Sequence, residues 1–373
     1  MSANWLSSRL LPLALAASVM VGMPSLNLGI LSTSSSIAIS AEIPAAPEKI
    51  LSTGDITNFE LAFKRYREND MENAEALLDE CIKAWVQTDQ ASDEIAALYK
   101  LRGNTKKFQK KYSEAIKDYD LALDYVLRED SSADPDQLPD TYLERARSEE
   151  QLGMWTQAEQ DYTRALDGFE ELGEDPNAFT LNSRGNCRRR RGDFAGAAED
   201  HLGARAGFAA AGDGARALIA LSDAALELYG GGGGGGEGAA LEAWAALVRE
   251  VTAPVSRDLG LLKQLAIRES EAHIALAAHY WDKNEKALAE TEWNQGCLRL
   301  DAILADEAFG RKIPNTDLFG VPVDRVDSCR KFQDPEWVRK RRFWPENLGE
   351  KLQNFVRSST TTRGGGKEIR EGK

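Results

Sequence analysis

One spacing recurs through the middle of the sequence. A small residue is followed by alanine twelve positions on, by an aromatic residue or histidine four positions later, and by alanine three positions after that. Three consecutive copies fit this spacing: Gly103, Ala115, Tyr119, Ala122; Ala146, Ala158, Tyr162, Ala165; and Gly185, Ala197, His201, Ala204. A weaker copy comes first, at Ala62, Ala74, Leu78 and Cys81, and Ala275 with Ala287 begins a degenerate last copy.

The residue types in this pattern predict helical hairpins. Two helices approach closely only where their side chains are small, and the ring of the second helix fills the space beside the small residue of the first. A single hairpin cannot bury its apolar face alone, so successive hairpins are expected to stack into a solenoid. We predict five or six hairpins over residues 58–310, one of them formed by residues 215–229 and 237–251.

The pattern resembles the tetratricopeptide repeat family, whose hairpins combine a small residue in the first helix with alanine, an aromatic residue and alanine in the second. The resemblance covers roughly residues 58–300. It implies an all-α, right-handed superhelical solenoid whose first helices line a concave groove that binds a partner protein. The copies begin farther apart than the ~34 residues of the family, and the surplus falls in Pro- and Asp-rich stretches between hairpins.

The segments outside the repeats have their own composition. Residues 1–41 combine a short basic start, an apolar run and small residues before Ala41, which is typical of a signal peptide; an uncleaved anchor is the alternative. We therefore expect the protein to cross a membrane. The other predicted boundaries are a linker at 42–57, a glycine insert at 230–236, a capping segment at 311–357 and a disordered tail at 358–373.

A run of four arginines, Arg188–Arg191, stands out in a chain whose formal net charge is −14. In the resembled fold these residues end a first helix, and certain positions of the first helices face the groove. We predict a groove that binds an acidic or extended segment of a partner protein. The candidate groove residues are Lys100, Asn104, Lys107, Arg147, Asn186, Arg189 and Arg190.

Two other interpretations of the arginine run remain at this point. Cationic residues in the last turn of a helix complement its macrodipole and need no partner. Nucleic acid is not expected, because the chain as a whole is acidic and no aromatic residues interleave with the arginines for base stacking.

The sequence carries no recognisable catalytic or metal-binding motif. The three histidines, His201, His273 and His279, belong to no H-E-x-x-H pattern, and the four cysteines form no C-x-x-C pair and are too few for a disulfide scaffold. We therefore predict a non-enzymatic protein with no metal, cofactor or small-molecule substrate. An enzyme with an unrecognised site is the less favoured alternative.

The C-terminal segment is both basic and aromatic. Trp337, Phe343 and Trp344 alternate with the basic residues 339–342, and an amphipathic stretch follows. This arrangement is similar to the C-terminal end of plant and algal chloroplast tetratricopeptide-like proteins described as lumenal, which implies the thylakoid lumen. The segment is expected either to cap the solenoid or to present a surface to a partner or to anionic lipid, giving peripheral membrane association.

These features together predict a scaffold or assembly factor, one candidate target being a thylakoid or other membrane complex. A structural subunit of a membrane-associated complex is the alternative. Repeat folds as a class act by binding, so this expectation comes from the fold and not from a recognised site.

Overall fold

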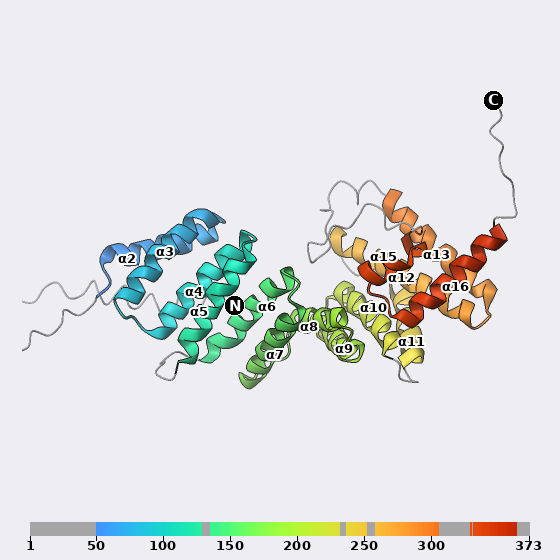
Figure 1. Ribbon diagram of the computed structural model, residues 1–373, viewed down its shortest axis with the longest axis horizontal. Helices are drawn as coiled ribbons and strands as arrows, with labels where there is room; N and C mark the ends of the chain where they lie inside the picture. The colour runs from blue at the N-terminus through green and yellow to red at the C-terminus, as the bar shows by residue number, and fades with distance from the viewer. Residues whose placement is uncertain are drawn as a thin grey trace, which may run out of the picture. The chain divides into compact units, whose positions relative to one another are not determined.

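The described part of the chain is entirely helical. The computed structural model describes residues 50–128, 135–231, 236–251, 258–305, 329 and 331–363. These residues form fourteen α-helices and two short 3-10 helices, and no strand occurs among them (Figure 1). The prediction of an all-α fold of tetratricopeptide-like hairpins is confirmed. The predicted signal segment 1–41 lies outside the described residues.

In the described part of the chain, six helical hairpins follow one another, each with a first and a second helix. They are α2 (Thr53–Arg67) with α3 (Met71–Gln87), α4 (Ser92–Phe108) with α5 (Tyr112–Leu127), α6 (Leu138–Gln151) with α7 (Trp155–Glu171), α8 (Ala178–Arg191) with α9 (Phe194–Ala210), α10 (Gly214–Gly230) with α11 (Gly236–Glu250), and α12 (Leu259–Asp282) with α13 (Lys286–Ala305). The 3-10 turn η1 (Pro135–Gln137) precedes α6, and η2 (Lys331–Gln333), α15 (Pro335–Arg341) and α16 (Glu346–Arg363) follow the last hairpin.

The chain divides into two compact units, Met1–Glu144 and Arg145–Lys373, which we call the N-terminal and C-terminal units. The sequence predicts a single solenoid over residues 58–310, whereas this division falls inside α6.

Two predicted boundaries are wrong, because a helix extends into each of the two segments. The residues assigned to a linker, 42–57, include the start of α2, where Ser52 and Asp55 form a capping box at Thr53. The residues assigned to a disordered tail, 358–373, include the end of α16, which continues to Arg363. The first and last residues of the predicted glycine insert belong to helices, because α10 ends at Gly230 and α11 begins at Gly236.

The repeat-defining small and aromatic residues form the contact between the two helices of a hairpin. A Cβ atom added at Gly103 would lie 2.7 Å from Cε1 of Tyr119, and one added at Gly185 would lie 2.9 Å from the His201 ring. The remaining members of the pattern are exposed by 1% or less: Ala115, Tyr119, Ala122, Ala146, Ala158, Tyr162, Ala165, Ala197, His201 and Ala204. The spacing therefore marks helix–helix packing.

A second repeating contact lies beside the first. One residue before each small residue stands an arginine, and one residue before each aromatic stands an aspartate, sixteen positions later. The side chains pair across the hairpin in all three full copies, as Arg102–Asp118, Arg145–Asp161 and Arg184–Asp200. The three aspartates are 2–3% exposed. These pairs were not predicted, although their fixed spacing is visible in the sequence.

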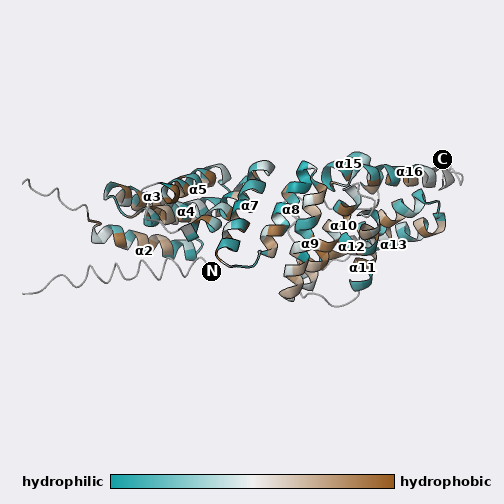
Figure 2. Ribbon diagram, turned by 90° about the horizontal axis from the view of Figure 1, so that it is seen from below, coloured by the Kyte–Doolittle hydropathy of each residue, from teal (hydrophilic) through white to brown (hydrophobic). Residues whose placement is uncertain are grey.

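Each unit has an apolar core between its helices. In the N-terminal unit, Trp85, Ile95 and Leu98 pack together with residues of α2, α3 and α4. In the C-terminal unit a larger core joins α10, α11, α12 and α13 around Trp244 and Ile274. Hydrophobic residues of α10 and α12 accordingly lie inside the C-terminal unit (Figure 2).

The C-terminal segment does not continue the stack of hairpins. Within the stack, the first helices α4, α8, α10 and α12 each pack against the second helix that precedes them. Helix α16 instead packs against two first helices, α12 and α10 (Figure 1). Its residues Leu348, Leu352 and Phe355 are 0–2% exposed, so this helix covers the apolar surface of the last hairpins. Of the predicted capping segment 311–357, residues 311–328 lie outside the described part.

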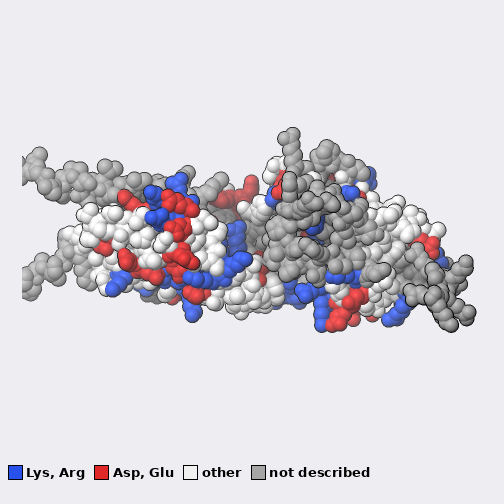
Figure 3. Space-filling view, turned by 90° about the horizontal axis from the view of Figure 1, so that it is seen from above, with Lys and Arg blue, Asp and Glu red and all other residues white. Residues whose placement is uncertain are grey.

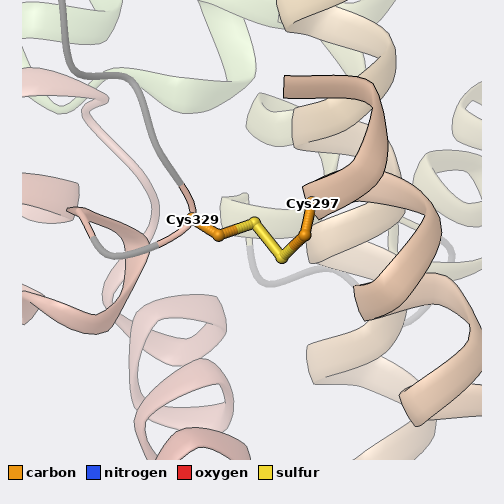
Figure 4. Close-up of a disulfide and its surroundings, with 2 residues drawn as sticks. All are labelled: Cys297 and Cys329. Atoms are coloured by element: carbon orange, nitrogen blue, oxygen red, sulfur yellow. A yellow bond between two sulfur atoms is a disulfide. The ribbon is translucent and has the colours of Figure 1, made fainter. Parts of the chain in front are cut away.

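A disulfide joins Cys297 of α13 to Cys329, just before η2 (Figure 4). The two Cα atoms are 5.4 Å apart. This bond was not predicted, because the four cysteines are few and lie far apart in the sequence. The other two cysteines, Cys81 and Cys187, are buried thiols, and burial raises the pKa of each.

Candidate functional site

The predicted groove residues of α4 share one face of that helix in the N-terminal unit. Lys107 forms an ion pair with Glu144 of α6. The Nζ atom of Lys100 lies 3.4 Å from Oδ2 of Asp140, also on α6. The two lysines therefore lie on the same side of α4, and each is paired with a carboxylate of α6.

The neighbouring groove residue, Asn104, has a structural contact as well. Its Oδ1 accepts a hydrogen bond of 2.8 Å from the buried Tyr119 hydroxyl. Close by, Phe108 is 56% exposed, its ring lies 5.9 Å from that of half-buried Tyr66, and Lys107 Nζ lies 5.5 Å from the Phe108 centroid. We call Tyr66, Lys100, Lys107 and Phe108 the N-terminal patch.

Arg147, the groove residue predicted on α6, belongs to the C-terminal unit and is exposed. Its place in a groove with the α4 residues stays a prediction.

Asn186 and Arg189 do not line an open groove, which corrects the prediction. The Arg189 side chain is 10% exposed, and NH1 donates a 2.8 Å hydrogen bond to Oδ1 of Asp223 on α10. Its Nε lies 3.7 Å from Oε1 of Glu227, and its NH2 donates to Oδ1 of Asn186, a residue that is itself 4% exposed. The prediction of an open position did not take into account the carboxylates of Asp223 and Glu227 on the next first helix.

Every arginine of the run has a specific neighbour, which accounts for the concentration of positive charge. Arg188 donates to Asp200 and to Glu159, and Arg191 also pairs with Glu159. The helix that they end is closed by Gly192 in the left-handed conformation, so the cations also complement its C-terminus.

The fourth member of the run, Arg190, contacts two aromatic rings. Its guanidinium carbon lies 4.3 Å from the ring centroid of Trp155 on α7 and 4.5 Å from that of Phe343 in the C-terminal segment. Such contacts between a cation and a ring face are attractive. Arg190 thus touches the C-terminal segment and is only partly accessible.

The charged network continues from α10 to α12 and to the C-terminal segment. Arg268 donates to Asp223 at 2.7 Å and to Glu271 at 3.1 Å. Glu271 also accepts from Arg342 Nε at 3.1 Å and from Trp344 Nε1 at 2.6 Å. We call the side of α8, α10 and α12 that carries Arg189, Asp223, Glu227, Arg268 and Glu271 the first-helix face of the C-terminal unit.

Burial and neighbouring cations set the protonation of this face. Burial alone would raise the pKa values of Asp223 and Glu271, but the adjacent guanidinium groups outweigh it and hold both values below the usual range. Burial dominates at Glu227 and raises its pKa, against the lowering effects of His201 and Arg189.

The three histidines each lie beside a carboxylate. His201 Nδ1 is 2.7 Å from Oε2 of Glu227, both fully buried. The corresponding distances are 2.5 Å for His273 and Glu292, and 3.0 Å for His279 and Glu237. Within the described ranges no group of three or more His, Cys, Asp or Glu residues is placed to hold a metal ion.

Basic and acidic residues are interspersed on the molecular face in Figure 3, and no continuous basic stripe is visible among its described residues. In the C-terminal segment, Arg339, Lys340 and Arg341 are exposed, whereas Trp344 is buried and Trp337 and Phe343 are half-buried. The aromatic side chains predicted to meet a partner or lipid are thus turned at least partly into the protein. No helix in the described part is long and apolar enough to span a membrane.

Comparison with known proteins gives distant structural likenesses only. No protein-family model matches the chain, and no curated protein sequence matches it. The structure is similar to BtubC from P. vanneervenii, with 17% identity, 71% of this chain and 95% of that chain covered, and a TM-score of 0.43. It is also similar to a tetratricopeptide repeat protein from Parabacteroides merdae, with 15% identity and a TM-score of 0.43; the match covers 82% of this chain and 100% of that chain.

Proposed function

We propose that this protein is a non-enzymatic scaffold that binds a segment of a partner protein on the first helices of its hairpins. The observation that carries the proposal is internal to the chain. In the C-terminal unit, the first helices α10 and α12 already hold a polypeptide segment, anchored by hydrogen bonds from Arg342 and Trp344 to Glu271. The same type of helix in the N-terminal unit carries the N-terminal patch.

The N-terminal patch is suited to an extended segment. Exposed Phe108 offers an apolar contact, Lys107 lies beside its ring, and Lys100 is on the same helix about two turns earlier. The Asp140 carboxylate is 42% exposed, and ion pairs open to solvent contribute little to stability, typically about 0–1 kcal/mol. A partner carboxylate would therefore replace Asp140 beside Lys100 at small cost, which favours an acidic or mixed segment over a strongly basic one.

The proposed location is an oxidising compartment across a membrane. The composition of residues 1–41 supports export. The Cys297–Cys329 bond adds support, because structural disulfides form and persist in oxidising compartments. The resemblance of the C-terminal segment narrows the proposal to the thylakoid lumen and to assembly of a membrane complex there. A fluorescent fusion that remains in the cytosol would contradict export.

Quantitative affinity capture tests the scaffold proposal. The variant Lys100→Ala/Lys107→Ala changes the N-terminal patch, and Lys83→Ala/Lys117→Ala removes the same charge from exposed positions on the second helices α3 and α5. We expect the first variant to lose a partner that wild type and control both retain. If no partner protein depends on the patch, the proposal is wrong for this unit. Stoichiometric recovery with one complex would instead favour a structural subunit.

A further inference from the structure

The contacts of residues 331–345 indicate what the first-helix face of the C-terminal unit recognises. Glu271 is fully buried and accepts hydrogen bonds from Nε and NH2 of Arg342 and from the indole of Trp344. An arginine and a tryptophan two residues apart thus converge on one carboxylate. Each contact is a charge-assisted hydrogen bond, the class with the strongest geometric specificity.

The charge of the face explains why the segment has to supply a cation. Helices α10 and α12 contribute three buried carboxylates, those of Asp223, Glu227 and Glu271. The hairpin helices contribute two guanidinium groups to them, from Arg189 and Arg268. Arg342 adds the third. Without the segment, Glu271 would lose two of its donors and keep only Arg268, and a buried carboxylate with missing partners is costly.

Apolar contacts complete the recognition. Phe332, Val338 and Trp344 are 2–3% exposed. Pro345 packs on the end of α10, where a Cβ atom added at Gly230 would lie 2.7 Å from its Cγ. The segment therefore presents an arginine, a tryptophan and a proline within four residues to a matching acidic and apolar surface.

The segment and the following helix are held in different ways. Helix α16 is fixed by apolar side chains, and the ring of Phe355 packs against Trp281 and Trp293 with centroids 5.2 Å apart in both cases. Residues 331–345 depend more on buried ion pairs, whose net stabilisation is small because the desolvation cost offsets the attraction. Phe343 also has a φ of 54°, a conformation that is unfavourable for a residue with a bulky side chain. Replacing residues 331–345 by a similar segment of a partner therefore costs less free energy than displacing α16.

We propose that the first-helix face of the C-terminal unit is a receptor for a partner segment that presents arginine followed two residues later by tryptophan, and that residues 331–345 occupy this receptor in cis. The proposal rests on the scaffold function above and specifies the chemistry of a partner. Binding of the partner displaces residues 331–345 while α16 stays in place. The disulfide at Cys329 keeps the displaced segment attached to α13.

The test uses a fluorescently labelled peptide of residues 331–345 and the full chain. Because the cis segment competes, wild type should bind the peptide weakly. The variant Arg342→Ala/Trp344→Ala should bind it at least about tenfold more tightly, equivalent to about 1.4 kcal/mol. Arg341→Ala is the matched control, since Arg341 is the exposed neighbour, and it should behave as wild type. A peptide with alanine in place of its arginine and tryptophan should bind to none of these proteins.

A further variant assigns the binding to Glu271. Glu271→Gln in the Arg342→Ala/Trp344→Ala background should reduce peptide binding about tenfold, since charge-assisted bonds are roughly twice as strong as neutral ones. Circular dichroism checks that each variant is folded. If Arg342→Ala/Trp344→Ala loses helicity, the conservative Arg342→Lys/Trp344→Phe variant should show a smaller gain in the same direction.

Three outcomes would overturn the inference. The first is that wild type binds the peptide as tightly as Arg342→Ala/Trp344→Ala or Arg342→Lys/Trp344→Phe does. The second is that binding does not depend on the arginine and tryptophan of the peptide. The third is a wild-type dimer that dissociates in the Arg342→Ala/Trp344→Ala variant, which would assign the face to a second copy of this chain. A chain that still captures its partner through the N-terminal patch while failing the peptide test refutes only this inference.

Discussion

Arg184 of α8 donates hydrogen bonds to Asp200 of α9 from Nε, at 3.0 and 3.2 Å, and from NH2, at 2.7 Å. Asp200 is 3% exposed and also accepts from Arg188 at 3.0 Å. The same arrangement, with the same separation of sixteen residues, occurs in the two preceding hairpins. A buried carboxylate thus ties the two helices of each full copy together.

We predict that Asp200→Ala strongly destabilises the C-terminal unit. Removal of one partner of a buried ion pair leaves an uncompensated charge and costs about 3–5 kcal/mol. Glu199→Ala is the control, because Glu199 is exposed on the same helix, and it should change stability by no more than about 0.5 kcal/mol. Urea unfolding followed by circular dichroism measures both, and equal midpoints for the two variants would contradict the prediction.

The buried Glu271 predicts a specific pH dependence of stability. Its folded-state pKa lies below the ordinary value, because Arg342 and Arg268 outweigh the effect of burial. A depressed carboxyl pKa adds stability above the unfolded value of about 4.3, and that stability is lost as the pH falls through the folded value. The difference in unfolding free energy between wild type and Glu271→Gln should therefore stay constant from about pH 7 to about pH 5.5 and shrink below about pH 4. A difference that grows on acidification would show that burial dominates.

Two glycines provide a matched test of the docked segment. Alanine at Gly230 would place its Cβ atom against Pro345, whereas alanine at Gly349 in α16 would meet no atom within 4 Å. We expect Gly230→Ala to destabilise the C-terminal unit by about 1–3 kcal/mol through overpacking. Gly349→Ala should stabilise α16 by up to about 1 kcal/mol through helix propensity. Thermal unfolding distinguishes them, and a stabilising Gly230→Ala would place Pro345 elsewhere.

The disulfide should contribute measurably to the stability of the C-terminal unit. Cys297 and Cys329 are 32 residues apart in sequence, and closing a loop of this size constrains the unfolded chain by about 3–4 kcal/mol. We predict that Cys297→Ala/Cys329→Ala lowers the urea midpoint and that a reducing agent lowers the wild-type midpoint to match. The variant itself should not respond to the reducing agent. A wild-type midpoint that is indifferent to reduction would indicate that the bond adds no stability.

The predictable part of the fold comes from residues whose type is dictated by their neighbours. Only a small residue fits beside the Tyr119 ring, and only a ring fills the space beside Gly103, so this pair is visible in the sequence at fixed spacing. The Arg–Asp pairs were equally regular and could have been found by the same alignment. The start of α2 at Thr53 was also encoded locally, by the Ser52 and Asp55 capping box.

The candidate site was less predictable because its key contacts join distant residues. Arg189 is buried only because Asp223 follows 34 residues later on the next first helix. Glu271 meets Trp344 across 73 residues, and no local pattern links the two. Helical spacing predicts which side of a helix a residue occupies. It does not reveal which segment covers that side. The burial of Asn186 and Arg189 could therefore not be predicted from the sequence.

The bond between Cys297 and Cys329 also determines how the chain transmits tension. A force applied to the end of α16 passes through α15 and η2 to Cys329, and from there through the sulfur atoms into α13 at Cys297. While the bond is intact, this covalent path does not run through the chain between the two cysteines. If a partner pulls on this end of the protein, the contact of α16 with α12 resists first. Once that contact breaks, the chain extends less before α13 unfolds, because the disulfide excludes the residues between Cys297 and Cys329 from the path.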